Sequence, residues 1–239
     1  ITANPLLANL LRVTDRDGNS TQSFMGNTYN LESQHTLDIG ASNRLIYGMN
    51  YRHNSLSSNG TDAFSRENRL GLYLQNEWRA TQSLTLVAGL RYDIDTFTNP
   101  TVSPRVALIY QAAPDHTFRV SGSVAYRPPT LYETHADVRA VTTLPIPPPG
   151  PPPIVVQGAR SLEPERIISY EAGYQGWYFN HRLRLRVDLF FNHISDLITT
   201  RITSATSASS LNDHGQADIY GGEAGIEFLA TSWLSGFAN

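Results

Sequence analysis

The sequence contains no cysteine and few charged residues. Because none of the 239 residues is Cys, disulfides and thiolate metal sites are excluded, although the cellular compartment stays open. Charged side chains make up 16% of the chain, below the roughly 25% typical of soluble domains. The formal net charge of −3 supplies no basic surface for a phosphate backbone. We therefore expect no nucleic-acid partner.

Long apolar runs are also absent, so the sequence predicts no transmembrane helix, which needs about 18 or more apolar residues. The chain opens on Ile1 and shows no signal-peptide pattern at its start. Its last residues, W-L-S-G-F-A-N, read as a strand that is cut short. We interpret the sequence as a fragment of a longer chain.

Motifs for catalysis and metal binding are missing as well. The seven histidines are scattered without H-E-x-x-H spacing, and neither a nucleophile elbow nor a phosphate loop is present. The segment D-R-D-G-N at residues 15–19 resembles the start of a calcium loop. However, Gly26 stands at the twelfth position, where a Glu is required, so a plain Asp-Gly turn is predicted. We expect no enzymatic activity, no bound metal and no cofactor.

The sequence does contain long stretches in which apolar and polar residues alternate, most clearly at residues 167–196. Tyr170, Ala172 and Tyr174 share one parity, and after the break at residues 179–181 the aliphatic residues from Leu183 to Leu189 alternate with charged ones. Successive side chains of a strand point to opposite faces, so each half has one apolar face and one polar face. The short break predicts an antiparallel hairpin whose strands exceed the usual five or six residues.

The same alternation recurs along the chain, at residues 44–52, 69–78, 84–95, 105–111, 117–127, 218–230 and 233–239, while the first forty residues are less clear. Short turns are expected near residues 41–43, 80–83, 112–116, 179–181 and 231–232. Between them lie connections that are mostly longer, near residues 56–65, 98–103, 128–164 and 199–216. Short turns at one edge and long loops at the other are typical of an outer-membrane barrel.

The aromatic residues agree with this interpretation. Trp78, Tyr110 and Tyr178 lie within about two residues of a short turn, on the aliphatic parity, whereas Tyr92 and Tyr126 lie near the opposite strand ends. Two such rows predict interfacial girdles. A soluble sandwich or propeller would also alternate, but no propeller-like repeat of 40–50 residues is present. We therefore predict an all-β, antiparallel transmembrane β-barrel.

Several phrases resemble one family, the TonB-dependent outer-membrane receptors that import scarce nutrients. They are spread over residues 69–223 in the family's order: L-Y-L-Q-N-E-W (72–78), G-L-R-Y-D (89–93), S-P-R-V-A-L-I-Y (103–110), R-P-P-T-L-Y-E (127–133), L-E-P-E (162–165), S-Y-E-A-G-Y (169–174), D-L-F-F-N-H-I-S-D-L-I (188–198) and Y-G-G-E (220–223).

The resemblance implies a 22-stranded barrel with a plug domain in its lumen. About a dozen strands are recognisable and no plug precedes them, so residues 1–239 are expected to be a partial barrel domain with the plug absent. The implied function is uptake of a scarce nutrient, foremost an iron chelate (siderophore), across the outer membrane of a Gram-negative bacterium. The implied partners are outer-membrane lipid, the small-molecule ligand and the TonB complex, which would act through the plug. A passive porin-like channel remains the alternative.

Two groups of residues are candidate sites. Strand parity predicts that one group faces the lumen, where it contacts a plug, attracts an anionic ligand, or pairs with neighbouring charges: Arg91, Arg119, Arg127, Glu171, Arg182, Arg184 and Arg186. The second group, Tyr132, His135 and Arg139, lies in the predicted long extracellular loop at residues 128–164 and consists of candidate ligand contacts. Within that loop, the proline run at residues 145–153 predicts a stiff polyproline II spacer.

Overall fold

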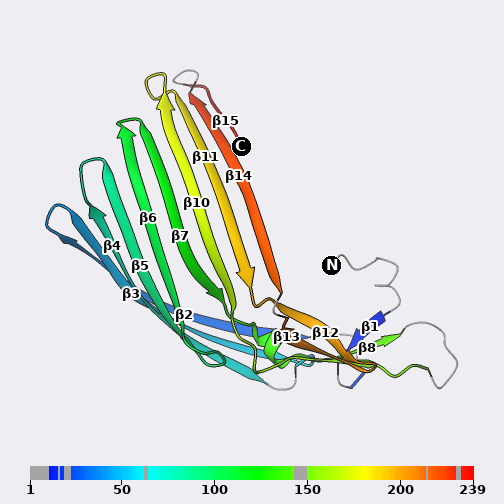
Figure 1. The fold of residues 1–239 in the computed structure, drawn as a ribbon. Helices are drawn as coiled ribbons and strands as arrows, with labels where there is room; N and C mark the ends of the chain where they lie inside the picture. Colours follow the sequence, from blue (N-terminus) through cyan, green and yellow to red (C-terminus); the bar gives the residue numbers. More distant parts are fainter. Residues whose placement is uncertain are drawn as a thin grey trace.

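A computed structural model describes residues 11–15, 17–18, 23–61, 64–142, 150–213, 215–229 and 233–239. In this part of the chain, fifteen strands form two sheets, and a short helix, α2 (Leu131–His135), lies between β7 (His116–Arg127) and β8 (Asp137–Thr142) in the chain. The larger sheet is a curved wall, and the smaller one lies against its lower end (Figure 1). No helix in the described ranges is long and apolar enough to cross a membrane.

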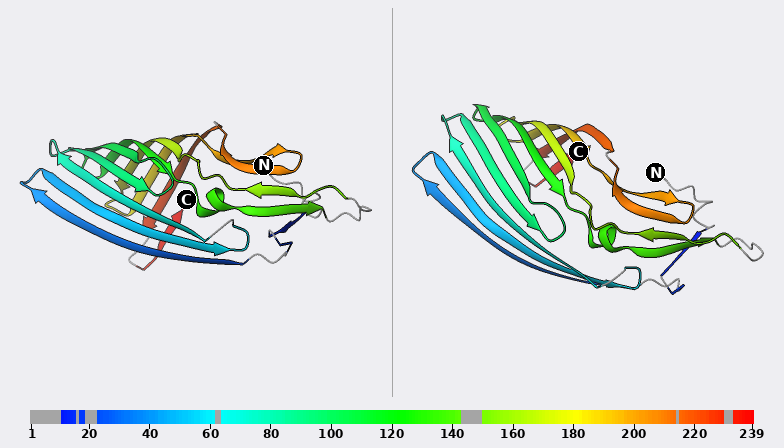
Figure 2. Two further views of the ribbon diagram at one scale, coloured as in Figure 1. Left: turned by 90° about the horizontal axis from the view of Figure 1, so that it is seen from below. Right: turned by 60° about the horizontal axis from the view of Figure 1, so that its bottom comes forward.

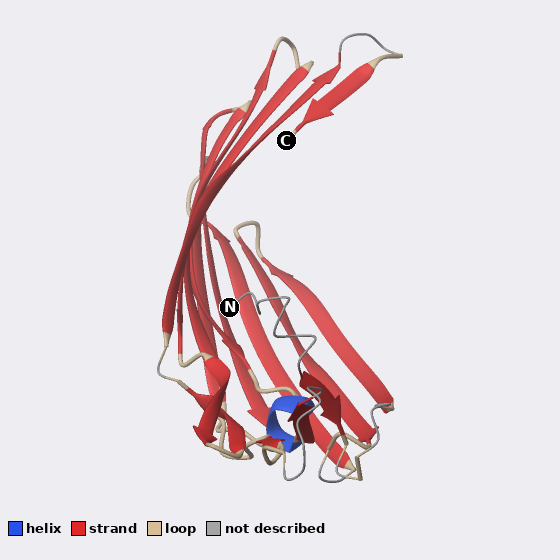
Figure 3. Cartoon of the chain, turned by 90° about the vertical axis from the view of Figure 1, so that its right-hand side faces the viewer, coloured by secondary structure: helices blue, strands red, loops and turns tan. Residues whose placement is uncertain are grey.

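The wall has ten strands in the order β15-β14-β11-β10-β7-β6-β5-β4-β3-β2, and every neighbouring pair is antiparallel. It is an open, curved sheet rather than a closed barrel (Figure 3). Its strands are β2 (Phe24–Ile39), β3 (Asn43–Ser58), β4 (Ser65–Arg79), β5 (Leu84–Asp95), β6 (Thr101–Ala113), β7 (His116–Arg127), β10 (Glu165–Tyr178), β11 (Leu183–Ser195), β14 (Gln216–Leu229) and β15 (Ser235–Ala238).

Strand register makes one face of the wall continuously apolar. Leu72 pairs with Tyr92, which pairs with Val102, and Tyr170 pairs with Phe191, which pairs with Tyr220. In β3–β7, β10 and β11, every exposed large hydrophobic side chain has this parity. The buried hydrophobic residues of the described chain are few and mostly small: Ala107, Ala136, Val138, Leu162 and Ala208. The described part of the wall therefore lacks the buried apolar core that is typical of a water-soluble protein. An exposed apolar face of this extent marks a membrane or interaction surface.

All short turns of the described wall lie at one edge, called the short-turn edge, and the longer connections lie at the other, called the loop edge (Figure 1). This confirms the predicted alternation of connections; the predicted turn at residues 231–232 lies outside the described residues. In the β10–β11 turn, Phe179, Asn180 and His181 all have positive φ. Arg182 belongs to this turn, because β11 begins at Leu183. The strand parity that predicted an inward direction for Arg182 therefore does not apply to it.

Most of the smaller sheet lies in two segments that were predicted as long connections between strands of the wall. Both segments do connect wall strands, and the regular secondary structure within them was not predicted. Residues 128–164 contain α2, β8 (Asp137–Thr142) and β9 (Ile154–Gln157), and residues 199–216 contain most of β12 (Ile198–Ser204) and β13 (Ser207–Asn212). With β1 (Leu11–Thr14), these strands form a sheet in the order β1-β8-β9-β13-β12 at the loop edge (Figure 2). Rows of Ser and Thr gave β12 and β13 little hydrophobic contrast in the sequence. The proline run lies outside the described residues up to 149; residues 150–153 form no strand.

Candidate functional site

The candidate site is a recess of about 350 Å³ on the polar face of the wall, near the loop edge. Its lining comes from β3 through β7, so the wall curves toward this face. Pro128 and Pro164, which flank the inserted segment of α2, β8 and β9, also border it. The charged and amide side chains that line it are Asn50, Arg52, Arg69, Arg91, Asp93 and Asp95. We call this the loop-edge recess.

Two of the three arginines in the loop-edge recess are held in ion pairs. Arg69 Nε lies 2.7 Å from Asp95 Oδ2, and its Nη2 lies 2.5 Å from Glu67 Oε1 and 3.2 Å from the Pro129 carbonyl oxygen. Arg91 donates to both carboxylate oxygens of Asp93 at 2.6–2.9 Å. These hydrogen-bonded pairs fix the side-chain directions and neutralise the charge of both arginines, so the two pairs add little net positive charge to the recess.

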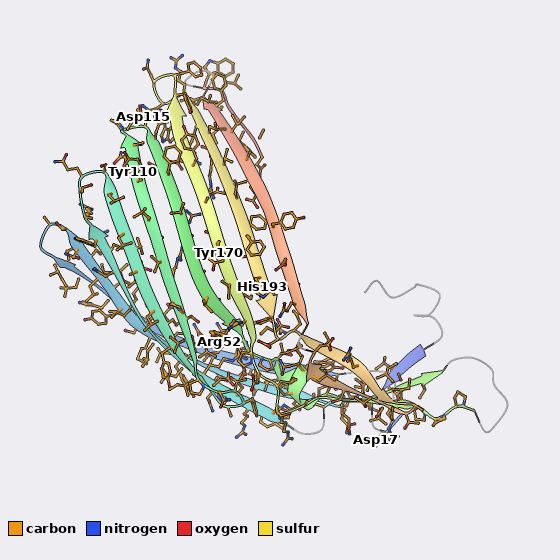
Figure 4. The ribbon with its side chains drawn as sticks, in the orientation of Figure 1. Asp17, Arg52, Tyr110, Asp115, Tyr170 and His193 are labelled. Carbon is orange, nitrogen blue, oxygen red and sulfur yellow. The ribbon has the colours of Figure 1, made fainter. Side chains whose placement is uncertain are left out.

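Arg52 differs from these two. It is exposed and lies directly across from Arg69 in the β3–β4 register, and it has no ion-pair or hydrogen-bond partner for its side chain within the described residues. Figure 4 places it near the loop edge. Arg105, two residues beyond the recess-lining Ser103, is also exposed and unpaired in the described part of the chain. Together they offer free guanidinium donors, which suit carboxylate and other anionic oxygen ligands.

Beside the recess, Arg127 joins the wall to α2. It donates to Glu165 at 2.5 and 2.7 Å and to Glu133 at 3.2 Å. Thr130 caps α2 in a reciprocal capping box with Glu133. Burial alone would raise the pKa of Glu133, but hydrogen bonds from Arg127 and Thr130 outweigh it and hold this pKa below its ordinary value. Glu165 also accepts the Ile198 backbone N–H at 2.8 Å, so this group ties β7, β10, β12 and α2 together.

Other loop-edge connections are fastened to the C-terminal end of α2. Thr61 forms a β-bridge with Ala136, and the Phe97 ring meets the His135 ring edge-on at 5.2 Å. The backbone N–H groups of Gly158 and Ala159 donate to the carbonyls of Ala136 and Glu133 at 2.8 and 3.0 Å. A Cβ at Gly158 would lie 2.5 Å from backbone atoms of residues 134 and 135, so only glycine allows this close approach.

The three predicted ligand contacts have different surroundings. Tyr132 is 39% exposed and lies 6.2 Å, centroid to centroid, from the exposed ring of Phe24. His135 is only 5% exposed and bonds through Nδ1 to Thr134 Oγ1 at 2.7 Å. Arg139 is half-buried on β8 of the smaller sheet. In this conformation, Tyr132 is the one of the three that presents an exposed side chain.

The residues predicted to face the lumen are mostly paired. Arg119 lies 3.2 Å from Glu171 and 3.6 Å from Asp188, and Asp188 also binds Arg186 at 2.6 Å. Arg184 pairs with Glu227. Arg91 belongs to the loop-edge recess and Arg127 to the α2 junction. Arg52, Arg69 and Asp95 were not predicted to be site residues, although all three have the polar parity of their strands.

Comparison with known proteins identifies the family. The family model of the TonB-dependent receptor-like β-barrel matches residues 2–239. This chain therefore belongs to the TonB-dependent receptors, and the matched part is their β-barrel domain. No curated protein matches it in sequence.

Solved structures share the fold. The siderophore receptor PirA from Pseudomonas aeruginosa is 17% identical, with a TM-score of 0.71 over 89% of this chain and 39% of its own. The ferric enterobactin receptor PfeA (G324V mutant) from the same organism is 16% identical, with a TM-score of 0.70 over 90% of this chain and 34% of its own. The FrpB iron transporter (F3-3 variant) from Neisseria meningitidis is 17% identical, with a TM-score of 0.69 over 87% of this chain and 34% of its own. The chain thus spans less than two fifths of each.

Proposed function

We propose that this chain forms part of the wall and mouth of an outer-membrane receptor that imports an iron chelate, a ferric siderophore. The observation that carries the proposal is the loop-edge recess, where Arg52 offers unpaired donors on the polar side of a wall whose other face is apolar. Siderophores bind iron through anionic oxygen atoms, and guanidinium groups recognise such oxygens. Two proteins that share this fold support the same ligand class, because PirA is a siderophore receptor and PfeA is a ferric enterobactin receptor.

In this proposal the loops around α2 capture the ligand, and the polar face of the wall lines its path. Release would depend on a plug domain and the TonB complex, as in the family. The proposal contains no catalytic step and no cofactor, and iron enters only as cargo. The apolar face would contact the lipid of a Gram-negative outer membrane, since alternating strands with one apolar face are how barrels meet lipid.

Uptake of ⁵⁵Fe-labelled siderophores tests the proposal in cells that express the full-length protein. A deletion strain should lose uptake of one ferric siderophore from a panel, and the restored gene should recover it only when TonB is present. Uptake that persists without TonB, accompanied by constitutive ion conductance of the purified protein in planar bilayers, would instead support the porin-like channel.

The lipid-facing assignment gives a stability prediction. Leu90 lies on the apolar face of β5, between Leu74 and Pro104. Leu90→Arg should destabilise the full-length protein in lipid vesicles by about 2–4 kcal/mol, the cost of an arginine on the lipid face near the bilayer midplane. Urea titration measures this loss in the free energy of unfolding, with the folded fraction followed by the electrophoretic band that shifts when the sample is heated. Val87→Arg is the matched control, because it lies on the polar face opposite Glu77 and should cost much less. Equal losses for the two variants would contradict the assignment.

A further inference from the structure

Three polar side chains meet on the apolar face of the wall, close to the short-turn edge. His116 Nδ1 lies 2.8 Å from Tyr174 Oη, and Tyr174 Oη lies 2.5 Å from Tyr178 Oη. We call these three residues the His–Tyr–Tyr cluster. Their parity is that of the aliphatic residues, so their polar atoms lie on the face assigned to lipid. Such groups are costly in hydrocarbon unless they find a partner.

The local sequence builds this cluster. Tyr174, Gly176 and Tyr178 follow one another on the same face of β10, and Gly176 pairs directly with His116 of β7. A Cβ at residue 176 would lie 2.2 Å from Tyr174 Oη and 3.0 Å from His116 Nδ1. The space above Gly176 therefore allows the two hydroxyl groups and the imidazole to converge. Phe118 packs beside Tyr174 at a centroid distance of 4.9 Å.

A count of donors shows that the cluster cannot satisfy itself. The two hydroxyls and a neutral imidazole carry three donor hydrogens, but the chain of contacts from His116 through Tyr174 to Tyr178 uses only two. If Tyr178 donates to Tyr174 and Tyr174 donates to His116, then His116 Nε2–H remains free. If the direction is reversed, the Tyr178 hydroxyl hydrogen remains free. In both arrangements one donor is left for an acceptor outside the cluster.

The position of the cluster indicates which kind of acceptor could take up the free donor hydrogen. Figure 4 places Tyr110 and Asp115 near the short-turn edge; Tyr110 pairs with Phe118, and Asp115 immediately precedes His116. This is the depth at which aromatic residues meet lipid headgroups. Arg182, in the turn that follows Tyr178, is exposed and makes no side-chain ion pair or hydrogen bond within the described chain. A free donor at headgroup depth, on an edge whose β10–β11 turn also carries an exposed cation, suits a phosphate oxygen.

We propose that the His–Tyr–Tyr cluster binds the phosphate headgroup of a phospholipid in the leaflet at the short-turn edge. This inference rests on the proposed membrane location, but it does not depend on the siderophore ligand. The site would hold one lipid where β7 and β10 meet and would anchor this edge of the wall at a fixed depth.

Native mass spectrometry of the purified full-length protein, delipidated and titrated with phosphatidylglycerol, tests the site. The double variant His116→Phe/Tyr178→Phe removes the free donor in either arrangement, and Gly176→Ala crowds the space in which the three groups meet. Each of these two variants should weaken the tightest lipid adduct roughly tenfold, the size expected for a hydrogen bond to a charged group. Tyr110→Phe removes a hydroxyl from the same edge outside the cluster and should leave that adduct unchanged. Diacylglycerol, which lacks the phosphate, should not form the adduct, and inorganic phosphate should not displace it.

Equal weakening by Tyr110→Phe, or an unchanged adduct in both cluster variants, would overturn the proposal. So would an adduct of equal strength with diacylglycerol, because the site would then recognise acyl chains only. Siderophore uptake, measured in parallel, separates this result from the transport function. A receptor that takes up no siderophore but shows the expected pattern of lipid adducts would overturn the ligand assignment and leave the lipid site standing.

Discussion

Arg52→Glu is expected to lower ferric-siderophore uptake by the full-length receptor at least tenfold. Arg52 is exposed at the loop-edge recess and has no side-chain partner within the described residues, so its donors are available to a ligand. Loss of a hydrogen bond to a charged group costs roughly 1.5–3 kcal/mol, and the new carboxylate adds repulsion toward an anionic chelate. Initial rates of ⁵⁵Fe uptake, at surface levels matched by immunodetection, measure the effect.

Two glutamine variants control for general loss of charge. Arg52→Gln should lower uptake roughly tenfold, whereas Arg44→Gln, on the same face of the same strand but paired with Asp38 near the short-turn edge, should leave it nearly unchanged. Arg52→Lys should restore part of the activity, since it returns the charge without the planar fork. Normal uptake by Arg52→Glu at normal surface level would remove Arg52 from the binding site.

Arg127→Leu is expected to detach α2 from the wall. Its guanidinium neutralises Glu165, which is 7% exposed, and Glu133. Breaking a buried pair from one side costs about 3–5 kcal/mol. Because the Arg127 side chain is 38% exposed, solvent screening lowers the expected loss of stability to roughly 2 kcal/mol. Hydrogen exchange of the full-length protein should show faster exchange at residues 130–136.

The double variant Arg127→Leu/Glu165→Leu should recover part of this loss, because it removes the unpaired buried carboxylate together with its partner. Arg119→Leu, which breaks more exposed pairs at the middle of the wall, should not change exchange in α2. If Arg127→Leu leaves the exchange of residues 130–136 unchanged, the junction does not hold the helix.

The same junction should weaken in acid. The pKa of Glu133 is lower in the folded protein than its unfolded value of about 4.3. Its stabilising contribution is therefore complete above that value and is lost as the pH falls through the lower, folded-state pKa. Protection of α2 should decline below about pH 4, as followed by proteolysis of the loop with pepsin. Glu133→Gln should lack this part of the acid transition, and an identical acid transition in the variant would contradict the assignment.

The wall could be predicted from the sequence because alternation is a local property. A strand repeats every two residues, so a row such as Leu84, Leu86, Ala88 and Leu90 defines an apolar face before any partner is known. The aromatic residues beside the short turns followed in the same way. Strand β2 was harder to recognise, since His35 and Ser33 interrupt its apolar parity.

The smaller sheet, and whether each charged residue is paired or free, could not be predicted because both depend on contacts between residues far apart in the chain. Strand β9 pairs in parallel with β13 some fifty residues later, and no local pattern encodes that choice. Parity gives Arg52 and Arg69 the same direction; only the register shows that Arg69 meets Asp95 while Arg52 meets no carboxylate in the described chain. His135 appeared available in the sequence and is buried by Phe97 and the Gly158 backbone.

The sequence by itself therefore determined the class of fold, the apolar and polar faces and the order of short and long connections. Each of these follows from side-chain direction along a single strand. Tertiary structure decided which arginines are free, which loop residues are exposed and where His116, Tyr174 and Tyr178 meet. Those properties depend on strand register and on the packing of loops that are far apart in the chain, where a shift of one residue would exchange one partner for another.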